Sequence, residues 1–294
     1  MTALRKRLTK RLMGFLCSED SVCVCNSYDV VGDIAIVRLT ERSRTCSEKV
    51  AEAVMAAHRS VKTVLAQASA VSGEFRVRRL EYVAGERKTC TVHRESGCLF
   101  SVDVEKCYFS PRLSYERMRV ARLVEDGETV VNMFAGVGCF SIVMAKHAEV
   151  EKVYSIDINP EAVRLMRENV RVNRVYGRVV PILGDAGEVV EERLRHVADR
   201  VLMPLPAKSL EYLPYALLAL KERGGWVHYY GFEHAAKCED AVDKARVKVS
   251  EKLLDICDSF EIPFGRVVRA TGPNWYQVVL DVKAKPGEAC TRLG

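Results

Sequence analysis

The stretch Val130-Val131-Asn132-Met133-Phe134-Ala135-Gly136-Val137-Gly138-Cys139-Phe140 places an apolar run directly before two glycines that one residue separates. A short apolar run with β-branched residues predicts a buried strand, and the glycines predict a tight turn after it. Such a turn lets the backbone approach a ligand closely and points the positive end of the next helix at it. We therefore expect a strand, turn and helix that bind a small molecule at the turn.

Two aspartates sharpen the expected ligand. Ser141 stands where a dinucleotide-binding fingerprint has its third glycine, so a pyrophosphate is not indicated. Asp157 ends the next predicted strand, 19 residues after Gly138, where a carboxylate can accept both hydroxyls of a ribose. Asp185 ends the third strand and can accept from the exocyclic amine of adenine. The three strand ends together indicate an adenosine without phosphates, and turn glycines with two helix-capping aspartates are the structural alternative.

The chain around this turn alternates short apolar strands with helical segments from residue 113 onward. We predict strands at 129–133, 152–156, 179–183, 200–203 and 226–232, helices at 113–123 and 235–257, and a terminal strand pair at 266–270 and 276–283. Asn159-Pro160 predicts a helix start and Gly224-Gly225 a helix end. This alternation is typical of a doubly wound, Rossmann-like α/β sheet with helices on both faces.

A smaller α+β module is expected before this sheet. Residues 28–40 predict strand, turn and strand, residues 47–68 carry apolar side chains at helical spacing, and strands are predicted at 75–80 and 102–108. We divide the chain into a basic segment (1–20), the α+β module (21–105) and the Rossmann-like domain (106–294).

Composition bounds the class of protein. The 294 residues are 48% hydrophobic and 29% charged, which is ordinary for a globular protein and excludes collagen-like or wholly disordered chains. No apolar run reaches the roughly 18 residues that a membrane span needs, and we identify no signal peptide, so a cytoplasmic protein without a membrane partner is expected.

The eleven cysteines are odd in number and scattered. Cys23 and Cys25 fit a strand better than a zinc site, so no metal is expected, while a disulfide stays open.

The positive charge is unevenly placed. The net charge is +6, and five of the first eleven residues are basic. A second cluster consists of Arg76, Arg78 and Arg79. Each cluster alone is as well explained by a solvated face, but together they favour a polyanionic partner.

Several motifs together resemble those of archaeal and eukaryotic tRNA guanine-37 N1-methyltransferases. They are Phe109-Ser-Pro-Arg-Leu-Ser-Tyr-Glu-Arg117, Phe134-Ala-Gly-Val-Gly138, Asp157-Ile-Asn-Pro160 and His228-Tyr-Tyr230, and Tyr28–Ala35 resembles the family's module before its catalytic domain. The resemblance covers about residues 25–284. It implies a class I methyltransferase fold, S-adenosylmethionine as cofactor, and methylation of N1 of guanosine at position 37 in the tRNA anticodon arm. A monomer is expected.

The resemblance also implies two catalytic roles. Glu116 matches the family's general base, and Arg76 matches the arginine that assists at the guanine. Guanine N1 carries a proton that a carboxylate must remove as the methyl group is attacked, and a guanidinium can stabilise the charge that grows on O6. The structural alternative for Glu116 is an exposed residue in the first turn of a helix, where the helix dipole favours it.

Further positions match cofactor contacts. Tyr108 and Phe134 match aromatic residues that line the pocket, with ordinary core packing as the alternative. Ser110 and Arg117 match contacts in the first motif. The full set of expected cofactor residues is Tyr108, Ser110, Arg117, Asn132, Phe134, Gly136, Gly138, Asp157, Ile158, Asp185 and Ala186.

Three departures from the family pattern matter. Asn132 stands where the family has an aspartate that meets the cofactor's ammonium group. Only about 20 residues precede the small module, where full-length relatives often have a domain that grips the tRNA elbow, so recognition is expected to be local to the anticodon arm. Pro204-Leu205-Pro206 replaces the usual Asn-Leu-Pro, as in an archaeal bifunctional branch that also methylates C7 of 4-demethylwyosine. That branch often has glutamate where this chain keeps Asp157, so the signature is mixed. We include Pro204 among the catalytic residues.

Two rival functions stay open. The first is the related transferase of wybutosine synthesis, which passes the aminocarboxypropyl group of the same cofactor, but the Phe109–Leu113 motif and Glu116 are not expected in it. The second is a catalytically silent tRNA-binding protein, against which the retained Glu116, Asp157 and Asp185 argue.

Overall fold

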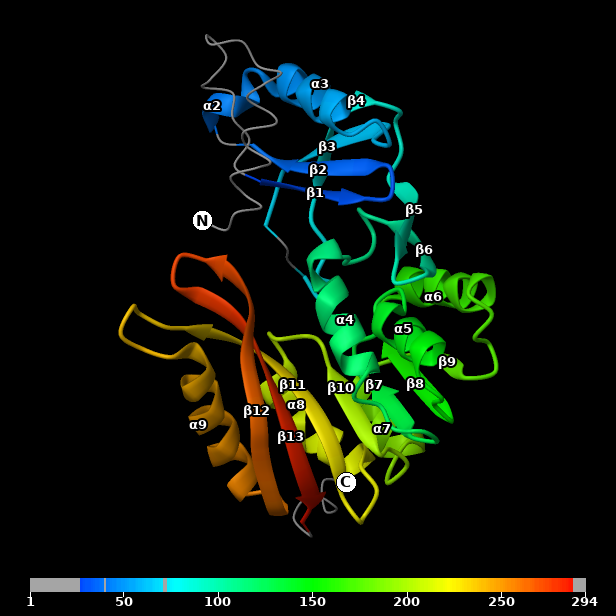
Figure 1. The fold of residues 1–294 in the computed structure, drawn as a ribbon, viewed down its shortest axis with the longest axis vertical. Coiled ribbons are helices and arrows are strands. Elements are labelled where there is room, and N and C mark those ends of the chain that lie inside the picture. Colours follow the sequence, from blue (N-terminus) through cyan, green and yellow to red (C-terminus); the bar gives the residue numbers. More distant parts are fainter. Residues whose placement is uncertain (1–26, 40, 71–72, 288–294) are drawn as a thin grey trace. The chain divides into compact units, whose positions relative to one another are not determined.

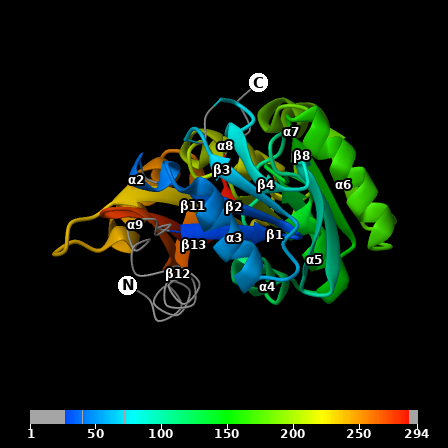
Figure 2. The ribbon, with the colours of Figure 1, turned by 90° about the horizontal axis from the view of Figure 1, so that it is seen from above.

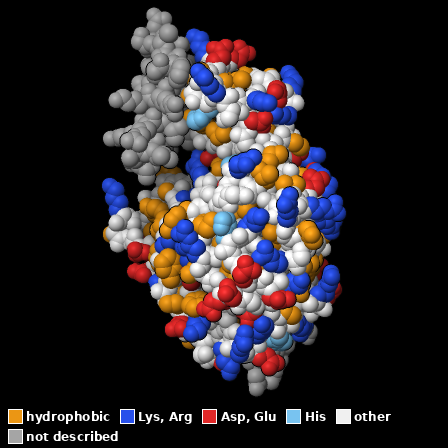
Figure 3. Space-filling view, turned by 45° about the vertical axis from the view of Figure 1, so that its right-hand side comes forward, with side chains coloured by type: hydrophobic (Ala, Val, Ile, Leu, Met, Phe, Trp, Pro, Cys, Tyr) orange, Lys and Arg blue, Asp and Glu red, His pale blue; other side chains and the backbone are white. Residues whose placement is uncertain are grey.

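The computed structural model describes residues 27–39, 41–70 and 73–287. The chain separates into two compact units, Met1–Arg112 and Leu113–Gly294. Figure 1 shows the helices and strands of both units. No helix in the described ranges is long and apolar enough to cross a membrane, and charged side chains spread over the face in Figure 3.

The first unit is a four-stranded sheet with a helical crossover and a separate hairpin. Its sheet has the order β1-β2-β3-β4, in which β2 and β3 are parallel and the outer pairs antiparallel. Val37, Val50, Val54 and Val64 lie in the core between the sheet and α3. The elements are β1 (Ser27–Val31), β2 (Ile34–Arg38), α2 (Glu41–Arg44), α3 (Ser47–Ala57), β3 (Thr63–Gln67), β4 (Leu80–Gly85) and the hairpin β5 (Cys90–Glu95) with β6 (Cys98–Asp103).

The predicted strand, turn and strand at 28–40 is confirmed, but three other predictions in this unit are wrong in extent. The helix predicted over 47–68 ends at Ala57, and Val64 and Leu65 lie in strand β3, because their apolar run fits either periodicity. The strand predicted at 75–80 begins only at Leu80. The strand predicted at 102–108 ends at Asp103, whose carboxylate accepts the backbone N–H groups of the next residues and closes a turn.

The second unit is built on a seven-stranded sheet of order β12-β13-β11-β10-β7-β8-β9. The five strands from β11 to β9 are parallel, and β13 and β12 add antiparallel strands. The predicted doubly wound α/β fold is therefore confirmed. The elements are η2 (Pro111–Leu113), α4 (Ser114–Ala121), β7 (Thr129–Asn132), α5 (Cys139–His147), β8 (Lys152–Asp157), α6 (Pro160–Val172), β9 (Val179–Leu183), α7 (Ala186–Arg193), β10 (Arg200–Met203), α8 (Ser209–Ala219), β11 (Gly225–His234), α9 (Ala241–Leu254), β12 (Cys257–Gly272) and β13 (Trp275–Pro286).

The C-terminal predictions need correction. The helix predicted over 235–257 starts at Ala241, where the Asp240 side chain caps it by accepting two backbone N–H groups. Strand β12 is much longer than the predicted 266–270. Helix α8 ends at Ala219, and the predicted helix-ending Gly224 lies in the turn before β11 with φ of 88°.

The two faces of this sheet differ in chemistry. Side chains alternate along a strand, so Met203, Tyr229 and Leu280 join the apolar core with α7, α8 and α9. The intervening residues, such as His228 and Asp281, point to the other face. Figure 1 shows α9 along β12 and α4 next to α5. Helix α4 therefore packs on a face that carries charged side chains.

Candidate functional site

The loop after β7 is held by the aspartate that ends β8. The backbone N–H of Gly136 donates to Asp157 Oδ2 at 2.7 Å, and Asn159 N–H donates to Oδ1 at 2.9 Å. Gly138 has φ of 90°, and a Cβ on it would lie 2.8 Å from Cγ of Met166. The predicted glycines and Asp157 are thus brought together, and only glycine fits at position 138.

Asp157 remains able to bind a ligand. Burial of its carboxylate raises its pKa, and the two backbone N–H donors oppose that rise. Each carboxylate oxygen has a second lone pair, so the group can still accept from neighbouring hydroxyls. Ile158 follows at the same strand end and is half-buried.

Asp185 caps a helix, as the structural alternative predicts. Its Oδ1 accepts from the N–H groups of Gly187 and Glu188, and its Oδ2 accepts from the Tyr212 hydroxyl at 2.5 Å. Burial and this bond raise the pKa of Tyr212, so its hydroxyl stays a donor. Tyr212 also packs edge-on against Phe134, with ring centroids 5.2 Å apart.

The same contacts bring together the residues that are predicted to bind the adenine of the cofactor. Phe134 follows β7, Asp185 follows β9, and Ala186 is the buried first residue of α7. Tyr212 from α8 joins them, although the sequence alone did not point to it. The carboxyl ends of β7, β8 and β9 therefore form one edge that contains Phe134, Gly136, Asp157 and Asp185.

Asn132 is fully buried with one unsatisfied atom. Its Nδ2 donates to Ser141 Oγ at 3.0 Å, and Ser155 Oγ donates to the same oxygen at 2.7 Å. Its Oδ1 has no hydrogen-bond partner among the described residues. A buried acceptor without a donor costs about 1–3 kcal/mol. The amide oxygen is therefore suited to a donor from a ligand, such as an ammonium group.

Glu116 is buried, with 1% of its surface exposed, so its structural alternative as an exposed residue is wrong. Its Oε1 accepts from Arg119 Nη2 at 2.7 Å and from the Tyr230 hydroxyl at 2.9 Å, and its Oε2 accepts from Arg266. Burial acts to raise the pKa of Glu116, but the hydrogen bonds from Arg119, Arg266 and Tyr230 together hold it below its ordinary value. The carboxylate is ionised, and Arg266 is the donor that the structure shows on Oε2.

A chain of buried charged groups continues from Glu116 across the sheet. Arg119 also donates to Asp281 at 2.6 Å, and Asp281 lies 2.6 Å from His228 Nδ1. His228 Nε2 lies 2.8 Å from Arg200, which pairs with Glu128 at 2.7 Å. We call Glu116, Arg119, Asp281, His228, Arg200 and Glu128 the buried charge network.

Sequence reasoning missed most of this network. The available signal was a charged or polar residue inside an otherwise apolar strand, as at Arg200 in β10, His228 in β11 and Asp281 in β13. Such residues are rarely buried unless they are paired.

Two arginines next to Glu116 contact aromatic rings. Arg117 is buried with its guanidinium 5.9 Å from the Phe140 ring centroid. The Arg266 guanidinium lies 4.9 Å from the Tyr115 ring centroid. Both contacts fall within cation–π range.

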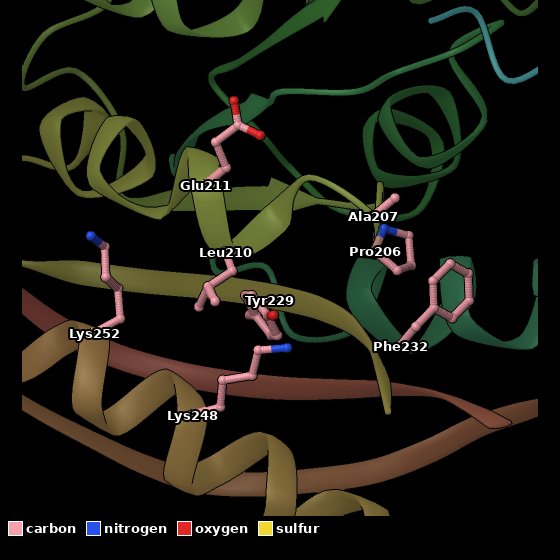
Figure 4. A pocket seen from close by; sticks show the side chains of 8 residues that line it. All are labelled: Pro206, Ala207, Leu210, Glu211, Tyr229, Phe232, Lys248 and Lys252. Atoms are coloured by element: carbon pink, nitrogen blue, oxygen red, sulfur yellow. The ribbon is translucent and has the colours of Figure 1, made fainter. Parts of the chain in front are cut away.

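Pro204 is half-buried directly after β10, at the start of the loop that leads to α8. A pocket of about 460 Å³ adjoins this loop (Figure 4). Tyr229 lines the pocket, whereas Tyr230 contacts Glu116. The pocket and Glu116 therefore lie on opposite faces of the sheet. Its lining residues are Pro206, Ala207, Leu210, Glu211, Tyr229, Phe232, Lys248 and Lys252.

Three predicted site residues belong to the first unit. Arg76 has a left-handed backbone with φ of 54°, and it lines a cavity of about 20 Å³ together with Tyr108. Ser110 is buried, two residues before Arg112, which pairs with Asp29 at 2.6 Å. The roles predicted for Arg76, Tyr108 and Ser110 stay predictions.

Cys23 and Cys25, for which the sequence favours a strand over a zinc site, lie outside the residues that the structure describes. Within the described ranges, no group of three or more His, Cys, Asp or Glu side chains could hold a metal ion. Of the cysteines in those ranges, Cys46 is disulfide-bonded and six others form no disulfide.

Comparison with known proteins identifies relatives along most of the chain. The TRM5/TYW2 methyltransferase domain matches residues 91–257, and the TYW2 N-terminal domain matches residues 8–89. The tRNA (guanine(37)-N(1))-methyltransferase Trm5b of Pyrococcus abyssi is 39% identical over 87% of this chain and 74% of its own. The tRNA 4-demethylwyosine(37)-methyltransferase Taw21 of Saccharolobus solfataricus is 35% identical over 95% of this chain and 99% of its own.

Solved structures agree with these relatives. The complex of aTrm5 with tRNALeu superposes with a TM-score of 0.78 and 36% identity, covering 96% of this chain and 78% of the other. Crystal structures of Pyrococcus abyssi Trm5b and of Pyrococcus horikoshii TYW2 with MeSAdo give TM-scores of 0.77 and 0.74, at 36% and 25% identity. They cover 94% and 96% of this chain, and 78% and 99% of their own.

Proposed function

Because the chain belongs to the TRM5/TYW2 methyltransferase family, we propose that it transfers the methyl group of S-adenosylmethionine to the purine at position 37 of tRNA. The predicted class I methyltransferase fold is confirmed by the same relationship. The observation that carries the proposal is the buried carboxylate of Glu116, in the motif that the resemblance assigns to the general base. Methylation at N1 of guanosine requires such a proton acceptor.

The residues of the second unit fit the cofactor. Asp157 would accept the ribose hydroxyls, and Asp185 with Ala186 would lie at the adenine. The unsatisfied Oδ1 of Asn132 supplies an acceptor for the amino group of the methionine end. When bound, the cofactor supplies a methyl group on a positively charged sulfur, which makes that methyl electrophilic.

Glu116 must change partners to act as a base. Its carboxylate accepts four hydrogen bonds from three residues, because Arg119 donates to Oε1 through both Nε and Nη2. The lowered pKa makes it a weak proton acceptor. Arg119 is 12% exposed at the side chain and Arg266 is 29% exposed. We assign Arg266 as the partner that leaves when the guanine enters, which frees Oε2 for the N1 proton. Losing one cation also raises the pKa of Glu116 toward a more useful value.

Once it has left Glu116, Arg266 is suited to donate hydrogen bonds to the target base. Its buried Nε has no hydrogen-bond partner among the described residues, and the ring of Tyr115 lies against its guanidinium. A released Arg266 therefore has donors for the base. Arg76 keeps the role that the resemblance gives it, which is to stabilise negative charge on O6.

A second candidate substrate is 4-demethylwyosine, with methylation at C7. Pro204 supports it, because proline offers an apolar surface and no side-chain amide to a larger, less polar tricyclic base. The similarity to Taw21 along 95% of the chain supports it as well. Aminocarboxypropyl transfer is the weaker alternative, represented by a Methanocaldococcus jannaschii relative at 32% identity.

Transcripts that differ at one nucleotide test the proposal. The protein is incubated with methyl-labelled S-adenosylmethionine and tRNA carrying either guanosine or adenosine at position 37. We expect label in the guanosine transcript alone. Equal labelling of both transcripts would move the target elsewhere in the tRNA, and labelling of neither would remove guanosine 37 as substrate.

A further inference from the structure

The C-terminal half of α6 and the turn after it carry an exposed, unpaired basic surface. Its members are Arg167, Arg171, Arg174, Val172 and Tyr176, which we call the α6 basic surface. Tyr176 is 76% exposed and Val172 is 54% exposed. Figure 2 shows α6 at the outer edge of the second unit, and in Figure 3 Lys and Arg side chains gather at its level.

The charges of this surface are not neutralised by neighbours. Arg164, one turn earlier, pairs with both Glu161 and Glu168. The side chains of Arg167 and Arg171 make no hydrogen bond or ion pair with any residue that the structure describes, and the same holds for Arg174. Three positive charges therefore face solvent along one side of the helix end.

The turn that follows α6 is fixed and holds Tyr176 outward. Arg174 N–H donates to Arg171 O at 3.0 Å, and Val175 N–H donates to Val170 O at 3.1 Å. Arg174 has a left-handed backbone with φ of 59°, which few residues other than glycine and asparagine adopt without cost. Because Val175 is buried beneath the turn, Tyr176 is presented to solvent by a rigid loop.

The chemistry of this surface suits RNA. Guanidinium groups bind phosphate through paired donors, and an exposed aromatic ring stacks on a base or ribose. We propose that the α6 basic surface binds the phosphate backbone of the tRNA substrate. The inference rests on the proposed function for the identity of the RNA.

The position of the surface defines which part of the tRNA it contacts. Helix α6 starts beside Asp157, at the edge assigned to the cofactor, and its 13 residues span about 20 Å at 1.5 Å per residue. Arg167 lies past the middle of this helix, and Arg171 and Arg174 lie at its far end and just after it, so all three lie away from the edge assigned to the cofactor. They bind phosphates outside the target nucleotide and contribute to affinity without touching the reaction.

A charge-matched pair of variants tests the inference. Arg167→Gln/Arg171→Gln removes two charges from the α6 basic surface, and Arg193→Gln/Arg195→Gln removes two charges at the end of α7 as a control. We expect the first variant to raise the KM for tRNA roughly tenfold and to lower the slope of log Kd against log salt by about two, one per arginine. The Kd for S-adenosylmethionine and the Tm stay unchanged in both variants.

Binding must also be measured without turnover. In the Arg167→Gln/Arg171→Gln variant, the Kd for the transcript with adenosine at position 37 is expected to rise by the same factor as the Kd for the guanosine transcript, because the contact does not involve the target base. This readout separates the inference from the proposed function, since it needs no methyl transfer. Tyr176→Ala is expected to raise the Kd for both transcripts by a smaller factor and to leave the slope of log Kd against log salt unchanged. Equal tRNA affinity and salt slope in the α6 and control variants would overturn the inference. It would also be overturned if the α6 variant lost binding only to phosphatidylserine vesicles.

Discussion

The guanidinium Nη1 of Arg200 lies 2.8 Å from Nε2 of His228, within the sheet of the second unit. Because a guanidinium only donates, Nε2 accepts and the ring proton sits on Nδ1, where it donates to Asp281. His228 is therefore neutral in the folded protein. It connects Arg200 to Asp281, which in turn orients Arg119 against Glu116.

His228→Gln is expected to remove part of the pH dependence of stability. Burial lowers the pKa of His228 and the charges of Arg200 and Arg119 add to this, while Asp281 opposes it. Below about pH 6.5 the unfolded chain binds a proton at His228 that the folded protein does not. The free energy of unfolding therefore decreases as the pH is lowered, by up to about 1.4 kcal/mol per pH unit.

Urea unfolding at several values between about pH 5 and 8 measures this effect. The wild type is expected to lose stability more steeply below about pH 6.5 than the His228→Gln variant. Identical slopes for the two proteins would show that His228 is not held neutral.

Glu116→Gln is expected to lower the rate of methyl transfer by at least about 100-fold, because the amide cannot accept the N1 proton. The Kd for S-adenosylmethionine should stay within about twofold of the wild type, since the proposed role begins only at proton removal. Isothermal titration and single-turnover kinetics measure the two quantities. A parallel loss of cofactor binding would contradict the base assignment.

Glu116→Ala is the harsher variant of the same position. It leaves Arg119 and Arg266 beside a cavity without a carboxylate, and breaking a buried ion pair in this way costs about 3–5 kcal/mol. Its loss of activity would therefore mix folding with chemistry, which makes Glu116→Gln the informative change.

Asn132→Asp is expected to strengthen cofactor binding and to lower the stability of the cofactor-free protein. The buried carboxylate would meet the cofactor's ammonium group where Oδ1 now lacks a donor, but without cofactor it is a buried unpaired charge. We expect a Kd for S-adenosylmethionine about tenfold lower and a free-protein Tm several degrees lower, by roughly 2–4 °C per kcal/mol.

Methylthioadenosine serves as the control ligand, because it lacks the amino acid. Its Kd should not improve in Asn132→Asp. If both ligands gained affinity equally, Asn132 would not lie at the methionine end.

Gly138→Ala is expected to damage the cofactor loop. The substitution puts a Cβ at φ of 90° and 2.8 Å from Met166, so it adds a clash to a backbone strain of about 1–3 kcal/mol. Gly127→Ala is the matched control, because Gly127 also has a positive φ of 78° but open space around it. Both variants lose stability, but only Gly138→Ala should raise the Kd for S-adenosylmethionine. An equal effect on that Kd in both would contradict the assignment of the loop.

The sequence predicted the parallel strands well because buried strands leave short apolar runs with clear boundaries, as at 152–156 and 200–203. It failed where one pattern fits two structures. Residues 58–67 carry apolar side chains at spacings compatible with a helix, but β3 pairs there with both β2 and β4. Pairing with strands from elsewhere in the unit makes this segment a strand, and the local sequence carries no signal of that pairing.

The site was predicted in outline but not in its partners. Gly136, Gly138 and Asp157 follow from strand ends and spacing, and the structure brings them together. Arg119 lies one turn away on the same helix as Glu116, but the other partners, Tyr230 and Arg266, come from β11 and β12, more than 100 residues later in the chain. Asp281, which holds Arg119, comes from β13. Such pairing depends on which strands become neighbours, so Arg266 and Asp281 could not be assigned from the sequence.

The most direct test of the central proposal identifies the modified nucleoside. The protein is incubated with S-adenosylmethionine and two tRNAs, one with guanosine and one with 4-demethylwyosine at position 37, and the digested nucleosides are identified by mass. We expect 1-methylguanosine from the first tRNA, and a single methyl group at C7 of the tricycle if Pro204 admits the larger base. Methyl on neither tRNA, or an aminocarboxypropyl group on the second, would contradict the account.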